Sequence, residues 1–268
     1  MFLKQIHLQN YRNYEQLELQ TENQVNLFVG PNAQGKTNLL ESIFVLALTK
    51  SHRTSKDKEL IGWQADAARI HGEVDKRYGG VKLDLSLSGQ GKRAKINGLE
   101  QRKLSDFVGS LNVVMFAPED LEIVKGTPGV RRRFLDMEIG QVQPGYLHTL
   151  QQYGKVLVQR NNYLKTSGGV QQAMMDVWNV QLAEHGVKIM KKRKHFIHKL
   201  QRWAEQIHAG ITAGHEQLRI EYRPSLDADS SEDESVLFDQ FMLKLSHVKD
   251  QETRRGMTLV GPHRDDLA

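Results

Sequence analysis

The chain has 268 residues, of which 39% are hydrophobic and 26% are charged. This balance supports one large or two modest folded domains and excludes disordered, collagen-like and low-complexity proteins. The net charge of +5 permits a nucleic acid or an acidic surface as a partner without requiring one. Because the sequence contains no cysteine, disulfides, zinc–thiolate sites and cysteine nucleophiles are excluded.

The longest fully apolar run, residues 43–48, is far shorter than the roughly 20 residues of a membrane span. The first residues also lack the basic region and apolar stretch of a signal peptide. We therefore expect a cytoplasmic protein without a membrane partner.

The first part of the chain predicts short strands followed by a loop and a helix. Alternating apolar residues indicate strands near residues 3–8 and 17–19, and the apolar run 25–29 is typical of a buried strand. A glycine-containing loop follows, and residues 38–48 have the apolar spacing of a helix. From about residue 68 to 114 the alternation has period two with glycine-rich turns, which predicts an antiparallel meander closed by a strand at 113–116.

The second part predicts helices. Residues 130–213 are mostly helical in pattern, with breaks at 143–145 and 167–169. The acidic, serine-rich stretch 225–235 indicates a solvated loop, and a helix resumes near residue 236. Residues 257–261 predict a strand that returns to the first region. We therefore expect an α/β fold in which a lobe formed by 1–120 and 251–268 is interrupted by a mainly helical lobe at 121–250.

A phosphate-binding motif, G-x-x-x-x-G-K-[ST], lies between the predicted strand and helix. Its glycines allow backbone N–H groups to point at phosphate oxygens, and the following helix adds the positive end of its dipole. Lys36 is expected to reach the β- and γ-phosphates, while the Thr37 hydroxyl is expected to bind Mg²⁺. The predicted nucleotide-binding residues are Gly30, Pro31, Asn32, Ala33, Gln34, Gly35, Lys36 and Thr37.

Hydrolysis also requires a carboxylate at the end of a buried strand, and the sequence offers no convincing one. Glu119 and Asp120 follow the apolar run 111–116, but Ala117-Pro118 separates them from it. Either acid is a candidate for the metal side of the site. The alternative is that they cap the next helix.

Several separate motifs in order along the chain resemble the RecF family of bacterial recombination mediators, which are relatives of SMC and ABC-type ATPases. They cover the whole chain, and the last three are the most specific. The motifs are LQNYRNY (8–14), GPNAQGKTNLLE (30–41), ALTKSHRT (47–54), FAPEDL (116–121), PGVRRRFLD (128–136) and GPHRDDL (261–267).

The resemblance implies an ABC/SMC-like ATPase head with an inserted helical lobe, which binds ATP and Mg²⁺ and pairs head to head as an ATP-dependent homodimer. It further implies binding of single-stranded or duplex DNA at gaps, and cooperation with RecO and RecR to load RecA in replication, recombinational repair and the SOS response. Arg12 and Asn13 match the position where related heads contact nucleotide. The family continues beyond a GPHRDD-like segment with the signature loop, Walker B and D-loop, so we expect this chain to be a fragment without ATP turnover.

A basic amphipathic helix is predicted at 187–211. Its apolar stripe includes Met190, Ile197 and Ile207, widened by Phe196 and Trp203, while cations occupy its other faces. Such cations suit phosphate neutralisation, although an ordinary solvated helix face is the alternative. The candidate DNA-binding residues are Lys188, Lys191, Lys192, Arg193, Lys194, Lys199 and Arg202.

Three further groups have competing interpretations. The arginines 131–133 either hold a junction, bind phosphate or pair with acids, and we favour the structural role. His52-Arg53 either stabilises the end of the helix or lies near nucleotide. His263 is adjacent to acids, as a general base would be, but an ionic network is the preferred interpretation.

Rival functions remain open at this point. An ABC-type transporter subunit or a small-molecule P-loop kinase would share the phosphate-binding loop. A non-catalytic DNA clamp that uses nucleotide structurally is a third possibility.

Overall fold

The computed structural model describes residues 1–21, 24–165, 172–226 and 233–268. These residues form two compact units. The first comprises 1–120 with 140–144, and the second comprises 121–139 with 145–268. No helix of the described residues is long and apolar enough to cross a membrane.

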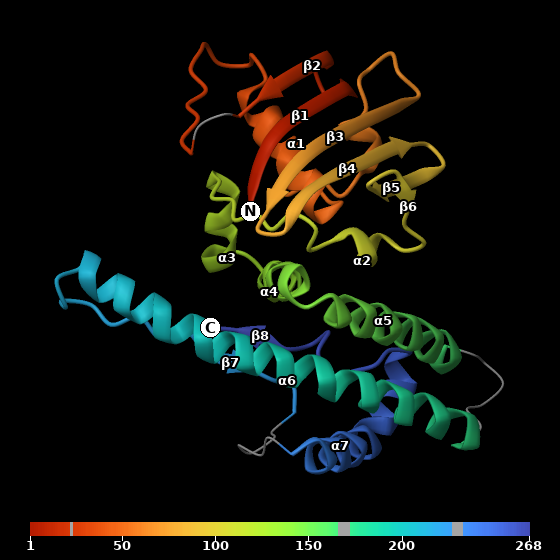
Figure 1. Ribbon diagram of the computed structural model, residues 1–268. Helices are drawn as coiled ribbons and strands as arrows, with labels where there is room; N and C mark the ends of the chain where they lie inside the picture. Colours follow the sequence, from red (N-terminus) through yellow and green to blue (C-terminus); the bar gives the residue numbers. More distant parts are fainter. Residues whose placement is uncertain (22–23, 166–171, 227–232) are drawn as a thin grey trace. The chain divides into compact units, whose positions relative to one another are not determined.

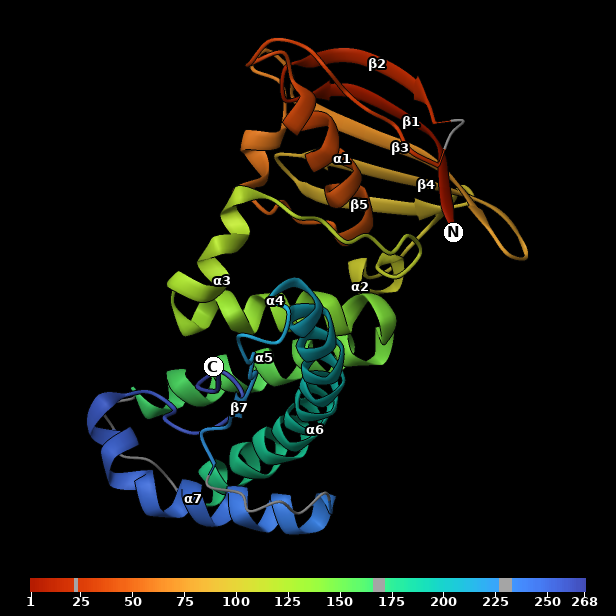
Figure 2. The ribbon, with the colours of Figure 1, turned by 90° about the vertical axis from the view of Figure 1, so that its left-hand side faces the viewer.

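The first unit is built on an antiparallel sheet in the order β2-β1-β3-β4-β5-β6 (Figure 1). Helix α1 (Lys36–Leu48) contacts β1, β3 and β4 from one face of the sheet (Figure 2). A 3₁₀ helix at Asp57–Leu60, the short helix α2 (Leu104–Phe107) and a 3₁₀ helix at Pro118–Leu121 lie in the connections. The strands are β1 (Phe2–Tyr11), β2 (Tyr14–Gln20), β3 (Ala67–Lys76), β4 (Gly79–Ser88), β5 (Gly91–Ile96) and β6 (Leu99–Glu100).

The predicted meander is confirmed, because β3, β4 and β5 pair in sequence order through tight turns. The alternation in the sequence matches the buried face, where Ile70, Leu83 and Leu85 are fully buried under α1. The predicted helix after the loop is also confirmed as α1.

Two predicted strands are wrong. Residues 25–29 have no strand conformation, and Val25, Leu27 and Val29 are each more than 80% exposed. Residues 113–116 are likewise not a strand; the Gln141 side chain instead bonds both the N–H and the C=O of Val113, at 2.8 and 3.1 Å. A buried strand needs neighbours on both edges, and among the described residues neither segment has a pairing strand.

The second unit is mainly helical. Its elements are α3 (Glu122–Lys125), α4 (Pro128–Val142), α5 (Pro144–Leu164), α6 (Gln172–Ile211) and α7 (Glu234–Arg255), with a two-stranded sheet of β7 (Tyr222–Arg223) and β8 (Asp266–Leu267). The helical prediction for this region is confirmed. The break expected at 167–169 and most of the loop expected at 225–235 lie outside the described residues.

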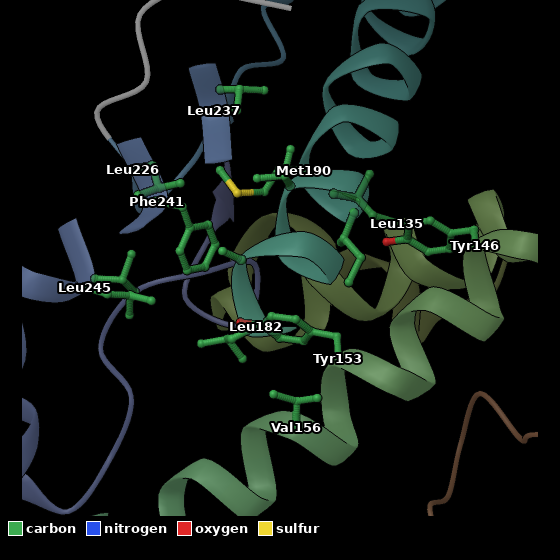
Figure 3. Close-up of a cluster of buried hydrophobic side chains, with 14 of the residues drawn as sticks. Leu135, Tyr146, Tyr153, Val156, Leu182, Met190, Leu226, Leu237, Phe241 and Leu245 are labelled. Carbon is green, nitrogen blue, oxygen red and sulfur yellow. The ribbon is translucent and has the colours of Figure 1, made fainter. Parts of the chain in front are cut away.

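A single hydrophobic core joins the long helices of the second unit. Val156 of α5, Leu182 of α6 and Phe241 of α7 are among the side chains that converge on it (Figure 3). Gly186 is required at this crossing, since a Cβ there would lie 2.7 Å from the Phe241 ring.

Residues 251–268 belong to the second unit in the structure, whereas the sequence led us to assign them to the first lobe. Val260 and Leu267 are part of the helical core, and the buried Asp265 bonds residues of the same unit. The strand expected at 257–261 is absent; Ser225 and Asn161 side chains bond Gly261 N and Thr258 N in place of a neighbouring strand.

The contact between α1 and the sheet gives a testable prediction. A Cβ added to Gly72 of β3 would lie 2.5 Å from Leu46 Cδ2 of α1, and Leu46 is fully buried. Gly72→Ala should therefore destabilise the sheet by about 1–2 kcal/mol through overpacking. Amide hydrogen exchange of β1 and β3 measures this. Gly89→Ala, where nothing lies within 4 Å, is the control and should leave exchange unchanged.

Candidate functional site

The glycine-containing loop predicted at 30–37 leads directly into α1. Gly35 occupies the N-cap position with φ 98°, and Ala33 also has a positive φ, of 64°. A Cβ at Gly35 would lie 2.7 Å from both Asn13 Nδ2 and the Tyr14 hydroxyl. Both the backbone angle and the lack of space therefore require glycine here.

The Lys36 side chain bonds the backbone of its own loop. Its ammonium donates to the carbonyl oxygens of Gly30, at 2.7 Å, and Pro31, at 2.6 Å. Residues 30–34 and Thr37 are exposed, so the outer surface of the loop is open to solvent. The loop, the positive end of α1 and the ammonium thus form an accessible anion-binding arrangement.

Arg12 makes a bidentate ion pair with Glu41 of α1. Its Nε and Nη2 lie 2.9 and 2.7 Å from the two carboxylate oxygens, and its Nη1 donates to Glu59 O at 2.8 Å. Glu41 is fully buried, and Ser51 Oγ donates to it at 2.5 Å. Burial opposes ionisation, but the hydrogen bonds from Arg12 and Ser51 outweigh it and hold the pKa of Glu41 below its usual value.

The Arg12 guanidinium therefore faces Glu41, and it fixes the β1–β2 turn to the helix that carries the loop. The expected contact of Arg12 with nucleotide stays a prediction. Sequence analysis overlooked Glu41, the last residue of the GPNAQGKTNLLE motif. The signal that was available is the unusual presence of a charged residue on the buried side of a predicted helix.

Asn13 lies beside the loop and belongs to a chain of polar contacts, and its expected contact with nucleotide stays a prediction. Asn38 of α1 donates to Asn13 Oδ1 at 2.8 Å, and Arg53 donates to Asn38 Oδ1 at 3.0 Å. Arg53 also lies 3.9 Å from a carboxylate oxygen of Glu119. Four motifs that are separate in the sequence thus meet around the N-terminal turns of α1.

The acids of the FAPEDL motif have local partners. Asp120 Oδ2 accepts from Ala117 N at 2.7 Å, which is the capping role considered for this pair. Glu119 faces Arg53. Within the described part of the chain, no group of three or more His, Asp or Glu side chains is arranged to hold a metal ion.

His52 packs edge-on against Phe44 of α1, with ring centroids 5.3 Å apart. Burial lowers the pKa of His52, so its neutral ring packs against the C-terminal half of α1. Of His52 and Arg53, Arg53 is the residue that bonds Asn38 in the first turns of α1.

The predicted cations of the basic helix divide into two groups on α6. Lys188, Lys192, Lys199 and Arg202 are exposed, while Lys191 and Lys194 are half-buried. A cavity of about 1170 Å³ lies along α6 and is lined by Lys188, Lys191, Lys192 and Lys194, together with His195 and His198. Three acids, Glu205, Glu221 and Glu234, also line it.

The prediction that Arg193 contacts DNA is wrong. Its side chain is only 2% exposed and pairs with Asp136, with Nη2–Oδ1 at 2.8 Å. Its Nη1 also donates to Pro262 O at 2.6 Å. Helical periodicity marks a basic helix, but it does not reveal which cation has a buried acid opposite it.

The PGVRRRFLD and GPHRDDL motifs are joined by an ion pair and hydrogen bonds. Arg131 makes a bidentate pair with Asp266, at 2.8 and 3.0 Å, and Arg132 donates to Asp265 O at 2.6 Å. Asp265 is fully buried and accepts from Ser225 N at 2.7 Å and from the Tyr222 hydroxyl. Arg131 therefore pairs with an acid, as one interpretation expected, although the acid is Asp266 rather than Glu119 or Asp120. The favoured role at a junction between lobes stays a prediction.

His263 is held in one neutral tautomer. Its Nε2 lies 3.1 Å from Thr258 O, and its Nδ1 lies 2.7 Å from the Tyr153 hydroxyl. Because a carbonyl oxygen only accepts, Nε2 carries the proton and Nδ1 accepts from Tyr153. Burial lowers the pKa of His263 to about 4, so the imidazole is uncharged at neutral pH and takes part in hydrogen bonds only. The ion pair at this segment is formed by Asp266 and Arg131 instead.

The phosphate-binding loop, its helix and the sheet beneath define a P-loop ATPase fold with a helical unit. A family model described as an AAA domain matches residues 5–112. The DNA replication and repair proteins RecF of Bacillus cytotoxicus and Bacillus cereus (strain AH820) are each 55% identical over 268 and 270 residues, which cover 100% of this chain and 72% of each relative. The chain belongs to the RecF family.

Solved structures agree with this membership. The structure of the recombination mediator protein RecF with ATP in the RecFOR pathway superposes with a TM-score of 0.95 at 32% identity, and the corresponding ATPrS structure with 0.93 at 31%. Each covers 99% of this chain and 72% of the other. The expected fold class, an ATPase lobe with a mainly helical lobe, is therefore confirmed.

The Glu41–Arg12 pair yields a stability prediction. Glu41→Gln leaves the Arg12 guanidinium without its counter-charge and should destabilise the first unit by about 2–3 kcal/mol, somewhat less than for a fully buried pair. Hydrogen exchange of α1 measures the loss. Glu73→Gln is the control, because its pair with Lys82 is exposed and its loss should leave exchange nearly unchanged. Equal effects of the two variants would contradict the structural role of Glu41.

His263 yields a pH prediction. Its folded pKa lies below the unfolded value, so the unfolded chain binds the proton first and stability falls as pH drops from about 6.5 to 4. The loss attributable to His263 is about 3 kcal/mol at most. Denaturation of wild type and His263→Gln, followed by Trp178 fluorescence in a Trp63→Phe, Trp203→Phe background, measures it. Identical pH dependence of the two proteins would show that His263 is not buried and neutral.

Proposed function

We propose that this chain binds ATP at residues 30–37 and acts on DNA in replication and recombinational repair. The observation that carries the proposal is the loop itself. Its glycine N-cap, its exposed outer surface and the Lys36 ammonium at its mouth are arranged at the positive end of α1. Membership in the RecF family, whose solved relatives include an ATP complex, supports ATP as the ligand.

Each residue has a separate proposed task. The loop N–H groups and the N-terminal end of α1 bind phosphate oxygens, and Lys36 meets the β- and γ-phosphates. The Thr37 hydroxyl is exposed in the first turn of α1. It is the proposed protein ligand of a Mg²⁺ ion whose other ligands are phosphate oxygens and water. Asn13, which lies against Gly35, is the proposed contact from the β1–β2 turn. Arg12 supports that turn through Glu41.

The DNA contacts are proposed to come from the helical unit. The exposed cations Lys188, Lys192, Lys199 and Arg202, with the half-buried Lys191 and Lys194, neutralise phosphates by releasing counterions. Such contacts respond to salt and strand structure rather than to base sequence.

The finer functions follow the family resemblance and remain proposals. ATP bound at the exposed loop bridges two copies head to head, and the dimer binds DNA at single-strand gaps. There it acts with RecO and RecR to place RecA on DNA, also during the SOS response. Family membership is the reason we prefer this function to a transporter subunit or a small-molecule kinase.

The nucleotide site is tested by Lys36→Ala. Loss of a charge-assisted contact to the phosphates should weaken ATP binding at least about 30-fold and remove any ATP-dependent dimerisation. Titration calorimetry with Mg-ATP and sedimentation with and without ATP measure the two effects. Lys58→Ala, which removes an exposed lysine of the same unit, should change neither. ATP affinity that survives in Lys36→Ala would refute the assignment of this loop.

A further inference from the structure

Helix α6 is longer than the core that covers it. Its 40 residues span about 60 Å, and its last member in the hydrophobic core is Ile197. Beyond that point Trp203, Ile207 and Ile211 are 70%, 61% and 79% exposed. The sequence placed Trp203 and Ile207 on the apolar side of this helix, and the structure leaves both exposed.

The exposure of Trp203 follows from how the chain returns after α6. The returning segment bonds Gln201, whose Nε2 donates to Leu218 O at 3.0 Å and whose Oε1 accepts from Ile220 N at 2.5 Å. His208 lies 3.5 Å from a Glu216 carboxylate oxygen on the same side. Trp203 is two residues from Gln201 and therefore points away from this covered side.

Trp203 continues a row of cations along one side of the helix. Lys188, Lys192, Lys199 and Trp203 follow one another at intervals of 4, 7 and 4 residues, which keep side chains on the same side. All four are exposed. We call these four residues the outer flank of α6.

The outer flank lies in a cationic part of α6, although Lys188 and Lys192 also line the cavity that contains Glu205, Glu221 and Glu234. Between Glu184 and Glu205 the helix contains no acidic residue, and it contains seven lysines and arginines. One of them, Arg193, is paired with Asp136, and Lys191 lies near Asp233. Charge complementarity therefore favours a polyanion as the occupant of this surface.

An exposed indole at the end of a cationic row favours single strands over duplex. Unpaired bases present their faces for stacking on aromatic side chains, whereas the bases of a duplex are already stacked on one another. Lysines alone would attract either form, since both carry phosphates. Trp203 is thus the residue that distinguishes the two.

We propose that the outer flank of α6 binds single-stranded DNA, with the lysines on the phosphates and a base stacked on Trp203. This inference rests on the proposed DNA-binding function and deepens it by assigning the single-stranded DNA that the family resemblance implies to one side of α6 and to a stacking residue.

The test measures binding of a labelled oligothymidine and of a duplex of equal length to the 268-residue chain across a salt series. Trp203→Ala should weaken single-strand binding roughly 5- to 150-fold and leave both duplex affinity and the salt slope unchanged. Trp203→Phe should retain most of the affinity. Replacing Lys188, Lys192 and Lys199 by Gln should reduce the single-strand salt slope by about 2.

Ile211→Ala is the matched control, because Ile211 is an exposed apolar residue near the same end of α6 without an aromatic face. Unchanged single-strand binding by Trp203→Ala overturns the proposal, and so does an equal loss in Ile211→Ala, which would indicate an apolar contact surface for a protein. If the wild-type chain binds duplex DNA but not the single strand, the assignment of the outer flank is overturned while the DNA-binding function stands. Binding to neither form overturns the DNA-binding function itself.

Discussion

The fully buried carboxylate of Glu41 is the constraint on which the first unit depends. A carboxylate removed from water is stable only with a counter-charge and hydrogen bonds, and Arg12 and Ser51 supply them. The same guanidinium holds Glu59 O, so the pair joins the β1–β2 turn, α1 and the connection after it. The position of Asn13 and Tyr14 against Gly35 follows from that junction.

The helical unit contains two further ion pairs in which a buried charged group joins separate elements. Arg193 joins α6 to Asp136 of α4 and to the carbonyl of Pro262, and Arg160 of α5 joins Glu252 of α7 at 2.5 Å and Thr258 at 2.7 Å. Both guanidinium groups are almost completely buried. The segment after α7 has little regular structure, and these bonds, together with its apolar side chains, fix its path through the unit.

The elements that the sequence predicted correctly are those set by the spacing of residues close together in the chain. The meander, α1 and the long helices follow from the spacing of apolar residues, and the loop at 30–37 follows from its motif. The segments 25–29 and 113–116 were misassigned because an apolar run becomes a strand only when a neighbour pairs with it. Periodicity also failed at the end of α6, where it marked Trp203 and Ile207 as apolar but carried no information on where the covering elements stop. Arg193 was misassigned because its partner, Asp136, is 57 residues away in the sequence.

The ammonium of Lys36 already has two acceptors in the loop, the carbonyls of Gly30 and Pro31. An ammonium has three N–H donors, so one remains for a ligand, and any further contact to Lys36 exchanges one of these two bonds. A triphosphate presents several oxygens to the ammonium and to the loop N–H groups at once, so it gains more contacts than it removes. Under the proposed function, the self-bonded lysine therefore favours polyphosphates, which also reach the loop N–H groups, over small anions such as chloride and acetate.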